Sequence, residues 1–305
     1  MKLSGYFQKG SSYYTLIKFY KMLNFIKTKT PITICDIGAK SGVDNDVDNT
    51  FFIDNLINNT NCNLYGFEPN KKEFDKLIST TNKKYFNYGI GNGTEEILNI
   101  YKAPGMCSIL EPNLEYLDFF ENFREWCEII AKIKIKTKKL DEVPFNSKID
   151  FIKIDVQGYE SEIIKFGKNT LKDSLVINIE VSPIPLYKKE KNFSYIYNEL
   201  NELGFVLHAF NRVETRCFKP ITIPNNRLTG INHLLQLDCI FIKNFEEIKK
   251  YSNENLKKLA MILFFSFNSY DLVDFIIQKI SNNESNNYID KYREIVKNLK
   301  VNKIY

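Results

Sequence analysis

Several sequence patterns that would assign a function directly are missing from this chain. It contains no G-x-G-x-x-G dinucleotide fingerprint and no G-x-x-x-x-G-K-[ST] phosphate-binding loop. There are only two histidines, and none of the six cysteines belongs to a C-x-x-C pair, so zinc-ligand spacing is absent. These absences argue against a typical NAD(P) site, a P-loop nucleotide site and a structural zinc site.

Long uninterrupted apolar segments are also lacking. The most apolar helical window, residues 259–277, is interrupted by Ser, Asn and Asp, and it falls short of the roughly 20 apolar residues that a membrane span needs. The first thirty residues carry several lysines and tyrosines without a long apolar run, so we expect no signal peptide. The cysteines stand among apolar neighbours, as reduced core residues do. We therefore expect a cytoplasmic protein without a membrane span.

Charge of one sign is not concentrated in the sequence. The 42 Lys and Arg residues against 37 Asp and Glu residues give a net charge of +5 over 305 residues. The one lysine-rich stretch, KIKIKTKK at 132–139, alternates as a strand with a solvated face does. Nucleic-acid-binding proteins more often carry a clustered basic stripe, so we expect no nucleic-acid partner.

The most informative segment that is present is ITICDIGAKSG at 32–42. Its apolar run predicts a buried parallel strand, and the glycines after it let the backbone approach a ligand closely. The segment NLYGFEPN at 63–70 repeats the pattern and ends in Glu68. An acidic side chain at the tip of a second strand commonly binds a ribose diol, so these two strand ends suggest a nucleoside-containing cofactor.

Strand patterns alternate with helix patterns along the chain, which implies a mostly parallel sheet with helices on both faces. Strands are predicted from 32 and at 63–67, 85–90, 96–101, 132–138, 148–155, 175–181, 204–210 and 236–243. Helices are predicted at 12–27, 44–59, 70–80, 114–130, 158–171, 193–203 and through 246–305. The stretch 211–235 is expected to be a long loop between the last two strands, which would pair antiparallel. The expected parts are an N-terminal helical segment (1–31), a main domain (32–245) and a C-terminal helical extension (246–305).

Ligands of open α/β sheets bind outside the carboxyl ends of the strands. The polar or glycine residues at predicted strand ends are Asp36, Gly38, Gly42, Glu68, Pro69, Asn70, Gly91, Asn92, Asp155, Gln157 and Glu180. A single glycine loop without a pyrophosphate fingerprint favours a cofactor that has no diphosphate. S-adenosylmethionine has a ribose and no phosphate, and Glu68 could hold its diol through two charge-assisted hydrogen bonds.

The chain resembles the FkbM-like S-adenosylmethionine-dependent methyltransferases over about residues 32–243. The matching segments are DIGAKSG (36–42), GFEPN (66–70), GIGNGTEEILNIY (89–101), GMCSIL (105–110), KLDEV (139–143), IDFIKIDVQGYESEIIKFG (149–167) and LDCIFIK (237–243). The KIDVQGYE block is the specific one. Gln157 stands where the family often has Glu.

This resemblance implies a class I methyltransferase with a Rossmann-like three-layer sandwich, a mostly parallel seven-stranded sheet, an antiparallel last strand and C-terminal helices. By position, Asp36, Gly38, Ala39 and Gly42 would face the methionine part of the cofactor, Glu68 and Pro69 the ribose, and Gly91 and Asn92 the adenine. Ser108 would lie near the cofactor or the acceptor, and Asp155 beside the sulfonium or the acceptor hydroxyl.

An alcohol acceptor must lose its proton as it attacks the methyl group, so a general base is expected. Asp155 is the first candidate, Glu180 the second and His208 the third. In an alternative with magnesium, Asp155 and Glu180 would share Mg²⁺. The expected reaction is O-methylation of a sugar, a glycan precursor or another small metabolite, the acceptor class resting on family analogy.

Three other functions stay open at this point: an NAD(P)-dependent oxidoreductase, a nucleic-acid methyltransferase, and an inactive scaffold with an interaction role for the helical tail. Acceptor specificity is expected from segments 102–130, 182–192 and 211–235. Their aromatic residues could stack on a sugar ring or simply pack, and they are Tyr116, Phe119, Phe120, Trp126 and Tyr187.

Overall fold

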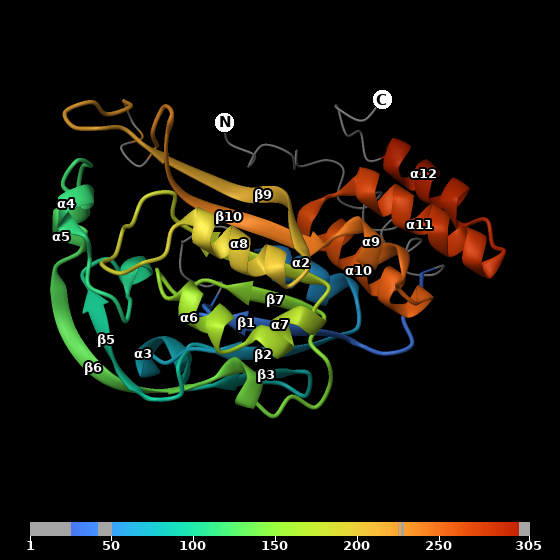
Figure 1. Cartoon of the computed structure of the whole chain (residues 1–305), viewed down its shortest axis with the longest axis horizontal. Helices are drawn as coiled ribbons and strands as arrows, with labels where there is room; N and C mark the ends of the chain where they lie inside the picture. Colours follow the sequence, from blue (N-terminus) through green and yellow to red (C-terminus); the bar gives the residue numbers. More distant parts are fainter. Residues whose placement is uncertain (1–25, 42–50, 225, 227–228, 299–305) are drawn as a thin grey trace. The chain divides into compact units, whose positions relative to one another are not determined.

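The structure, a computed structural model, describes residues 26–41, 51–224, 226 and 229–298 (Figure 1). It divides into two compact units. Among the described residues, one unit contains 33–41 and those within 63–249, and the other contains 26–32, 51–62 and 250–298. All six cysteines are free thiols.

The first unit is built on a seven-stranded sheet in the order β3-β2-β1-β7-β8-β10-β9. Its strands are β1 (Ile32–Ile37), β2 (Cys62–Phe67), β3 (Lys83–Phe86), β7 (Phe151–Ile154), β8 (Val176–Val181), β9 (Phe205–Arg216) and β10 (His233–Lys243). The pairs β1–β7, β2–β3 and β7–β8 are parallel, while β10 is antiparallel to both β8 and β9. The Rossmann-like α/β fold, the mostly parallel sheet and the antiparallel last strand are therefore confirmed.

The central strands are buried on both faces. Every residue of β1, β7 and β8 is buried, as expected of parallel strands that read as continuous apolar runs. Helices α6 (Glu160–Lys165), α7 (Lys168–Asp173) and α8 (Phe193–Glu202) lie side by side over one face (Figure 1). Their buried side chains join those of the sheet in one core: Ile163, Ile164, Leu171, Ile196 and Leu200.

A second, three-stranded sheet has the order β4-β6-β5. It consists of β4 (Gly89–Ile90), β5 (Glu95–Tyr101) and β6 (Ile129–Lys138), with β5 and β6 antiparallel. Along β6, Lys132, Lys134, Lys136 and Lys138 are exposed while Thr137 is buried, so the predicted solvated lysine face is confirmed. The single strand predicted at 85–90 is wrong, because the chain changes sheets between β3 and β4.

The long helix predicted at 114–130 is also wrong. Only α4 (Leu114–Leu117) and α5 (Phe123–Trp126) form, separated by Asn122 in the left-handed conformation (φ 69°), and β6 begins shortly after them. The aromatic residues of this segment build a second small core instead of one helix face. Its buried members are Tyr101, Leu117, Phe120, Phe123, Cys127, Leu186, Tyr187 and Leu235.

Three further predictions need correction. The helix at 70–80 is reduced to α3 (Lys71–Phe74), capped by Asn70, and the helix at 158–171 divides at Gly167 into α6 and α7. A Cβ on Gly167 would lie 2.7 Å from a Leu140 side-chain carbon, so the chain breaks where it packs against the short helix η3 (Leu140–Glu142). The loop at 211–235 is shorter than predicted, because β9 and β10 extend into it. Another short helix, η2, spans Pro104–Met106.

The second unit is helical. It contains α2 (Phe51–Asn59), α10 (Asn253–Phe267), α11 (Tyr270–Glu284) and α12 (Tyr288–Asn298), whereas α9 (Phe245–Lys249) closes the first unit. The Ser266 hydroxyl donates to the Phe52 carbonyl at 3.0 Å and joins α10 to α2. The C-terminal helices are thus confirmed, while the three-part division at residues 31 and 245 stays a prediction.

Residues 12–25 of the helix predicted at 12–27, and the first part of the one predicted at 44–59, lie outside the described residues. Within the described part of the chain, no helix combines the length and apolarity needed to cross a bilayer.

Candidate active site

The register of the sheet brings three strand ends level with one another. Ile37 of β1 pairs with Ile154 of β7, and Ile154 pairs with Ile179 of β8. The residues at these ends, Asp36, Asp155 and Glu180, are 4–5% exposed. Three carboxyl groups from three strands therefore gather at the carboxyl edge of the sheet, as the sequence predicts.

The loop after β1 passes very close to the end of β7. Gly38 has φ +80°, and a Cβ built on it would lie 1.9 Å from the Asp155 carbonyl oxygen, so only glycine fits there. The N–H groups of Gly38 and Ala39 both donate to the Phe67 carbonyl at 3.0 Å. Gly38 and Ala39 thus lie between the ends of β7 and β2, whereas Gly42 lies outside the described residues.

Lys153 is a functional candidate that the sequence analysis missed. Its side chain is 2% exposed, and its Nζ lies 3.2 Å from Asp36 Oδ1 and 3.6 Å from Asp155 Oδ2. Burial acts to lower the pKa of Lys153, but the two carboxylates outweigh burial and raise it above its ordinary value. The lysine therefore stays charged. The signal in the sequence was a lysine inside the apolar run IDFIKID at 149–155.

Gln157 joins the two predicted catalytic carboxylates. Its Nε2 donates to Asp155 Oδ1 at 2.9 Å and to Glu180 Oε2 at 2.6 Å. Arg212 of β9 donates to Glu180 Oε1 at 2.6 Å and to Asp238 Oδ2 at 3.0 Å. The structure thus confirms that Asp155 and Glu180 lie together, and it adds Arg212 and Asp238, which sequence reasoning did not single out.

The surroundings push the pKa values of the two carboxyls apart. Burial acts to raise the pKa of Asp155, but the charges of Lys153 and Lys40 and the Gln157 hydrogen bond bring it below its usual range. Burial and the Asp155 charge raise the pKa of Glu180 well above its usual range, against the opposing effect of Arg212. Pairs of carboxyls separated in this way are typical of acid–base sites.

Glu68 stands at the end of β2 as predicted. Its side chain is 9% exposed, and its Oε1 accepts a hydrogen bond from Asn70 N at 2.6 Å. Burial raises the pKa of Glu68 to about 7. Within the described part of the chain this is the one hydrogen bond to its carboxylate, so the group has capacity for further donors. A ribose diol supplies two O–H donors, and the residue present therefore fits a nucleoside ligand.

The other predicted residues have local partners. The Gly91 N–H donates to the Lys138 carbonyl at 2.8 Å. Asn92 Oδ1 accepts from Thr94 N at 2.9 Å, and its Nδ2 donates to Glu96 Oε1 at 2.6 Å. The Ser108 hydroxyl donates to the Gln157 carbonyl at 2.6 Å. Their roles in cofactor binding stay predictions.

His208 is not brought to the carboxyl edge. It precedes Arg212 by four positions on β9, which is roughly 13 Å along a strand. Arg212, at the level of Asp238 and Glu180, holds the place near the carboxylates. As for the magnesium alternative, no group of three or more His, Cys, Asp or Glu side chains among the described residues is arranged to hold a metal ion.

Comparisons with solved structures give low similarities. Magnesium protoporphyrin IX methyltransferase from Synechocystis PCC 6803, solved with bound S-adenosylmethionine, shares 9% identity at a TM-score of 0.37 and covers 76% of this chain and 78% of its own. A candidate S-adenosylmethionine-dependent methyltransferase from Listeria monocytogenes shares 8% identity at a TM-score of 0.38, covering 75% and 96%. A candidate methyltransferase from Thermoplasma acidophilum shares 9% identity at a TM-score of 0.35, covering 72% and 70%. These values are too low to carry any property of those proteins to this chain.

Family membership rests on the sequence itself. No curated protein matches the chain. Residues 36–207, more than half of the chain, match the family model of the methyltransferase FkbM domain. This segment begins at Asp36 and includes Gly38, Glu68, Asp155 and Glu180. The chain therefore belongs to the FkbM family of S-adenosylmethionine-dependent methyltransferases, and it is a methyltransferase.

Proposed function

We propose that this methyltransferase transfers the methyl group of S-adenosylmethionine to a hydroxyl group of a small molecule, with a sugar or glycan precursor as the preferred acceptor. The observation that carries the cofactor assignment is the buried Glu68 carboxylate. Among the described residues it accepts one hydrogen bond, from Asn70 N, so it can also accept hydrogen bonds from the two hydroxyls of a ribose. The O-methylation and the acceptor class rest on the carboxylate pair and on family analogy.

Residues that follow β1, β2 and β4 would each contact a different part of the cofactor. Gly38 and Ala39 present backbone close to the strand ends, where Asp36 and Lys153 form a buried ion pair. Glu68 would hold the ribose, with Pro69 beside it, and Gly91 and Asn92 would lie near the adenine. S-adenosylmethionine supplies a methyl group activated by the positive charge on its sulfur.

Asp155 and Glu180 would bind the acceptor hydroxyl and take up its proton. Asp155 has its pKa below the usual range, so it is ionised at any working pH and can accept a hydrogen bond from the hydroxyl. Glu180 is the more basic group of the pair and is joined to Asp155 through Gln157. A positioned base of this kind contributes about 10²- to 10⁴-fold to a rate.

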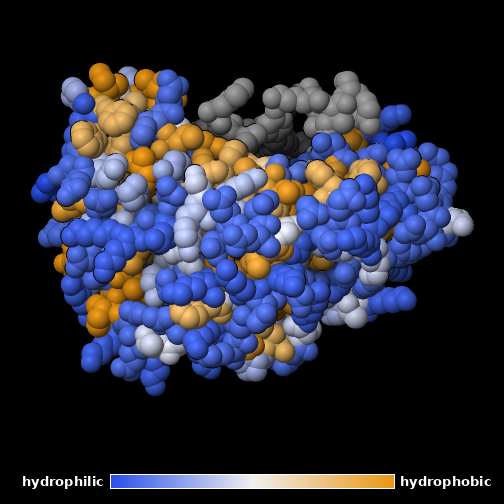
Figure 2. All heavy atoms as spheres, in the orientation of Figure 1, coloured by the Kyte–Doolittle hydropathy of each residue, from blue (hydrophilic) through white to orange (hydrophobic). Residues whose placement is uncertain are grey.

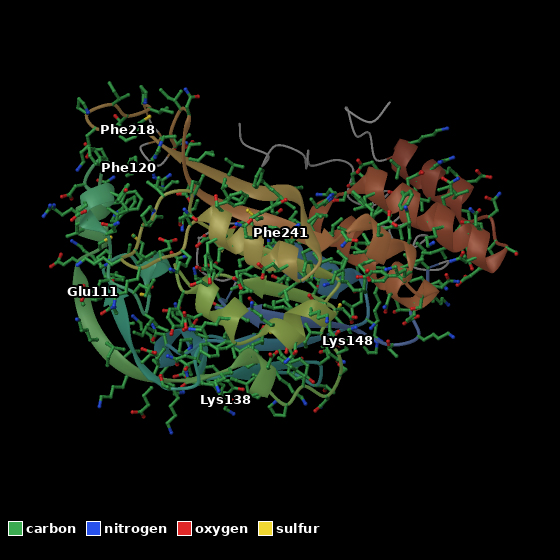
Figure 3. All side chains as sticks on the ribbon, in the orientation of Figure 1. Glu111, Phe120, Lys138, Lys148, Phe218 and Phe241 are labelled. Carbon is green, nitrogen blue, oxygen red and sulfur yellow. The ribbon has the colours of Figure 1, made fainter. Side chains whose placement is uncertain are left out.

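The acceptor-side aromatic residues separate into two groups. Phe120 and Tyr187 are 1% exposed and pack in the small core, whereas Tyr116 and Phe119 are 42% and 57% exposed. Figure 2 shows apolar side chains at the surface where α4 lies in Figure 1. Phe218 extends this surface from beyond β9, with its ring centroid 5.2 Å from that of Phe120 (Figure 3). An acceptor ring would therefore stack on the exposed group.

Isothermal titration separates this proposal from the oxidoreductase and nucleic-acid alternatives. S-adenosylhomocysteine is expected to bind, and NAD is expected to give no heat because the dinucleotide fingerprint is absent. RNA and DNA are expected not to bind at low salt, where phosphate contacts are strongest. Binding of NAD in place of S-adenosylhomocysteine would reverse the assignment.

Glu68→Ala is expected to weaken S-adenosylhomocysteine binding about 10- to 100-fold, because two hydrogen bonds to a charged acceptor are lost. In the wild-type protein the Kd is expected to rise as the pH falls below about 7, since the carboxylate must be ionised to accept both O–H groups. The rise is about tenfold per pH unit well below the pKa. Calorimetric titrations at several pH values measure both effects.

Asp75→Asn is the matched control, because Asp75 is an exposed acid that pairs with Lys71 just after α3. This variant is expected to keep the wild-type Kd and its pH dependence. An unchanged Kd in Glu68→Ala, or a pH dependence that survives in it, would contradict the ribose assignment.

A further inference from the structure

Gln157 has a backbone conformation that is unusual for its residue type. Its φ is +57°, and Gly158 follows with φ +94°. Non-glycine residues adopt positive φ in only a few per cent of cases. A Cβ on Gly158 would lie 2.8 Å from the Tyr187 ring, so the turn is packed tightly at this point. The turn places the Gln157 side chain between the ends of β7 and β8.

Each polar group of the Gln157 side chain and its backbone carbonyl has a hydrogen-bond partner. The two hydrogens of Nε2 go to Asp155 and Glu180, and Oε1 lies 3.1 Å from the Tyr187 hydroxyl. The backbone carbonyl accepts from the Ser108 hydroxyl at 2.6 Å. Since Nε2 has two hydrogens and no acceptor capacity, it can serve two carboxylates at once.

A glutamate in the same place could not do this. A carboxylate only accepts hydrogen bonds, and with a proton of its own it has a single O–H. It could then donate to Asp155 or to Glu180 but not to both, and a bridge between the two would need a second proton on one of them. Two carboxylates sharing one site raise each other's pKa values because like charges repel. The amide donates to both carboxylates without a titratable proton of its own.

We propose that Gln157 is a positioning residue for methyl transfer, whose neutral amide holds Asp155 and Glu180 as one unit without a bridging proton. The positioning role rests on the proposed function, whereas the proton-free bridge does not. The charged and titratable groups around Gln157 and its two carboxylate partners come from the neighbouring strands and loops: Asp36, Lys40, Lys153, Asp155, Glu160, Glu180, Tyr187, Arg212 and Asp238.

Gln157→Glu tests the bridge without any knowledge of the acceptor. The new carboxyl has a raised pKa in the folded protein, so the variant loses stability relative to the wild type as the pH rises from the unfolded-state pKa, about 4.3, toward the folded one. The Tm difference is expected to grow by about 2 °C per pH unit over that window. Thermal unfolding of both proteins at several pH values measures it.

Gln236→Glu is the matched control, because Gln236 Nε2 donates to Glu180 Oε2 at 3.0 Å. Unlike Gln157, Gln236 makes no hydrogen bond to Asp155 in the described part of the chain, so this variant is expected to show a smaller pH-dependent loss. Parallel Tm profiles for Gln157→Glu and the wild type would overturn the proton-free bridge.

Turnover tests the positioning role, with labelled S-adenosylmethionine and a panel of monosaccharides and nucleotide sugars. Gln157→Glu is expected to lower kcat about tenfold or more at pH 8. Its kcat is expected to recover toward pH 6, where the new carboxyl is protonated. The KM for the cofactor is expected to change less than about threefold. Gln157→Met, which cannot donate, is expected to lose kcat equally at both pH values. A wild-type kcat profile in Gln157→Glu would overturn the role. Absence of wild-type turnover would count against the proposed function, and the unfolding profiles would still decide the bridge.

Discussion

Asp155→Asn is expected to lower kcat about 10²- to 10⁴-fold, the usual contribution of a positioned general base. Asparagine has almost the same shape, and its Oδ1 can still accept from Gln157 Nε2, which lies 2.9 Å from Asp155 Oδ1. The variant therefore loses the ability to take a proton without losing this contact. Initial rates of methyl transfer, with circular dichroism to confirm the fold, measure the effect.

Glu180→Gln is the comparison that assigns the base. The raised pKa of Glu180, caused by burial and by the Asp155 charge, makes it the more basic carboxyl. If Glu180→Gln loses more activity than Asp155→Asn, the proton goes to Glu180 and Asp155 orients the hydroxyl. Near-native rates in both variants would remove the base role from the pair.

Lys153→Met is expected to destabilise the protein by about 3–5 kcal/mol, since removing one partner of a buried ion pair leaves an uncompensated charge. In this case two carboxylates, Asp36 and Asp155, lose their common cation. The loss corresponds to a fall in Tm of roughly 5–8 °C for a chain of this length. Chemical and thermal unfolding measure the two quantities.

The stability loss in Lys153→Met is expected to depend on pH, because the carboxylates that Lys153 contacts titrate. In the wild type the lowered pKa of Asp155 contributes stability that is present above its unfolded-state pKa and is lost as the pH falls through the folded one. Without Lys153 the folded-state pKa rises, so the variant's deficit is expected to be larger at neutral pH than at about pH 4.

Lys134→Met, at an exposed position on β6, is the control for that experiment and should change the stability by less than about 0.5 kcal/mol. Adding Asp155→Asn to Lys153→Met should restore part of the loss, because one of the two unpaired charges is removed. The ion-pair explanation would be contradicted if the stability losses of the two single variants simply added in the double variant. It would also be contradicted if the stability loss of Lys153→Met did not depend on pH.

The sheet was predictable because its strands are buried on both faces. Residues 148–155 and 175–181 read as apolar runs, and these become β7 and β8 with every residue buried. The segment 114–130 was not predictable in this way. Its aromatic residues pack around Tyr187 and Leu235, which are far away in the sequence, so periodicity along the segment carries no information about its fold.

The residues of the site were also predictable only in part. Those that follow a recognisable strand were found, and those that depend on contacts between distant segments were missed. Glu68, Asp155 and Glu180 could be found because strand ends are visible in the sequence. Lys153 was missed because its partner Asp36 lies on another strand, and the sequence does not show that β1 and β7 are paired. Arg212 was missed because it lies in a stretch that reads as a loop, and only the pairing of β9 with β10 brings it to Glu180.

The lysines of β6 have a consequence for how copies of this protein meet one another. Among the described strands, β6 pairs with β5 along most of its length and with β4 only at Thr137 and Lys138. Its remaining edge carries unpaired backbone groups, which are a template for aggregation. If two such edges join in the register that puts both lysine rows on the same face, the ammonium groups oppose one another, so the alternating lysines disfavour edge-to-edge growth of fibres in that register.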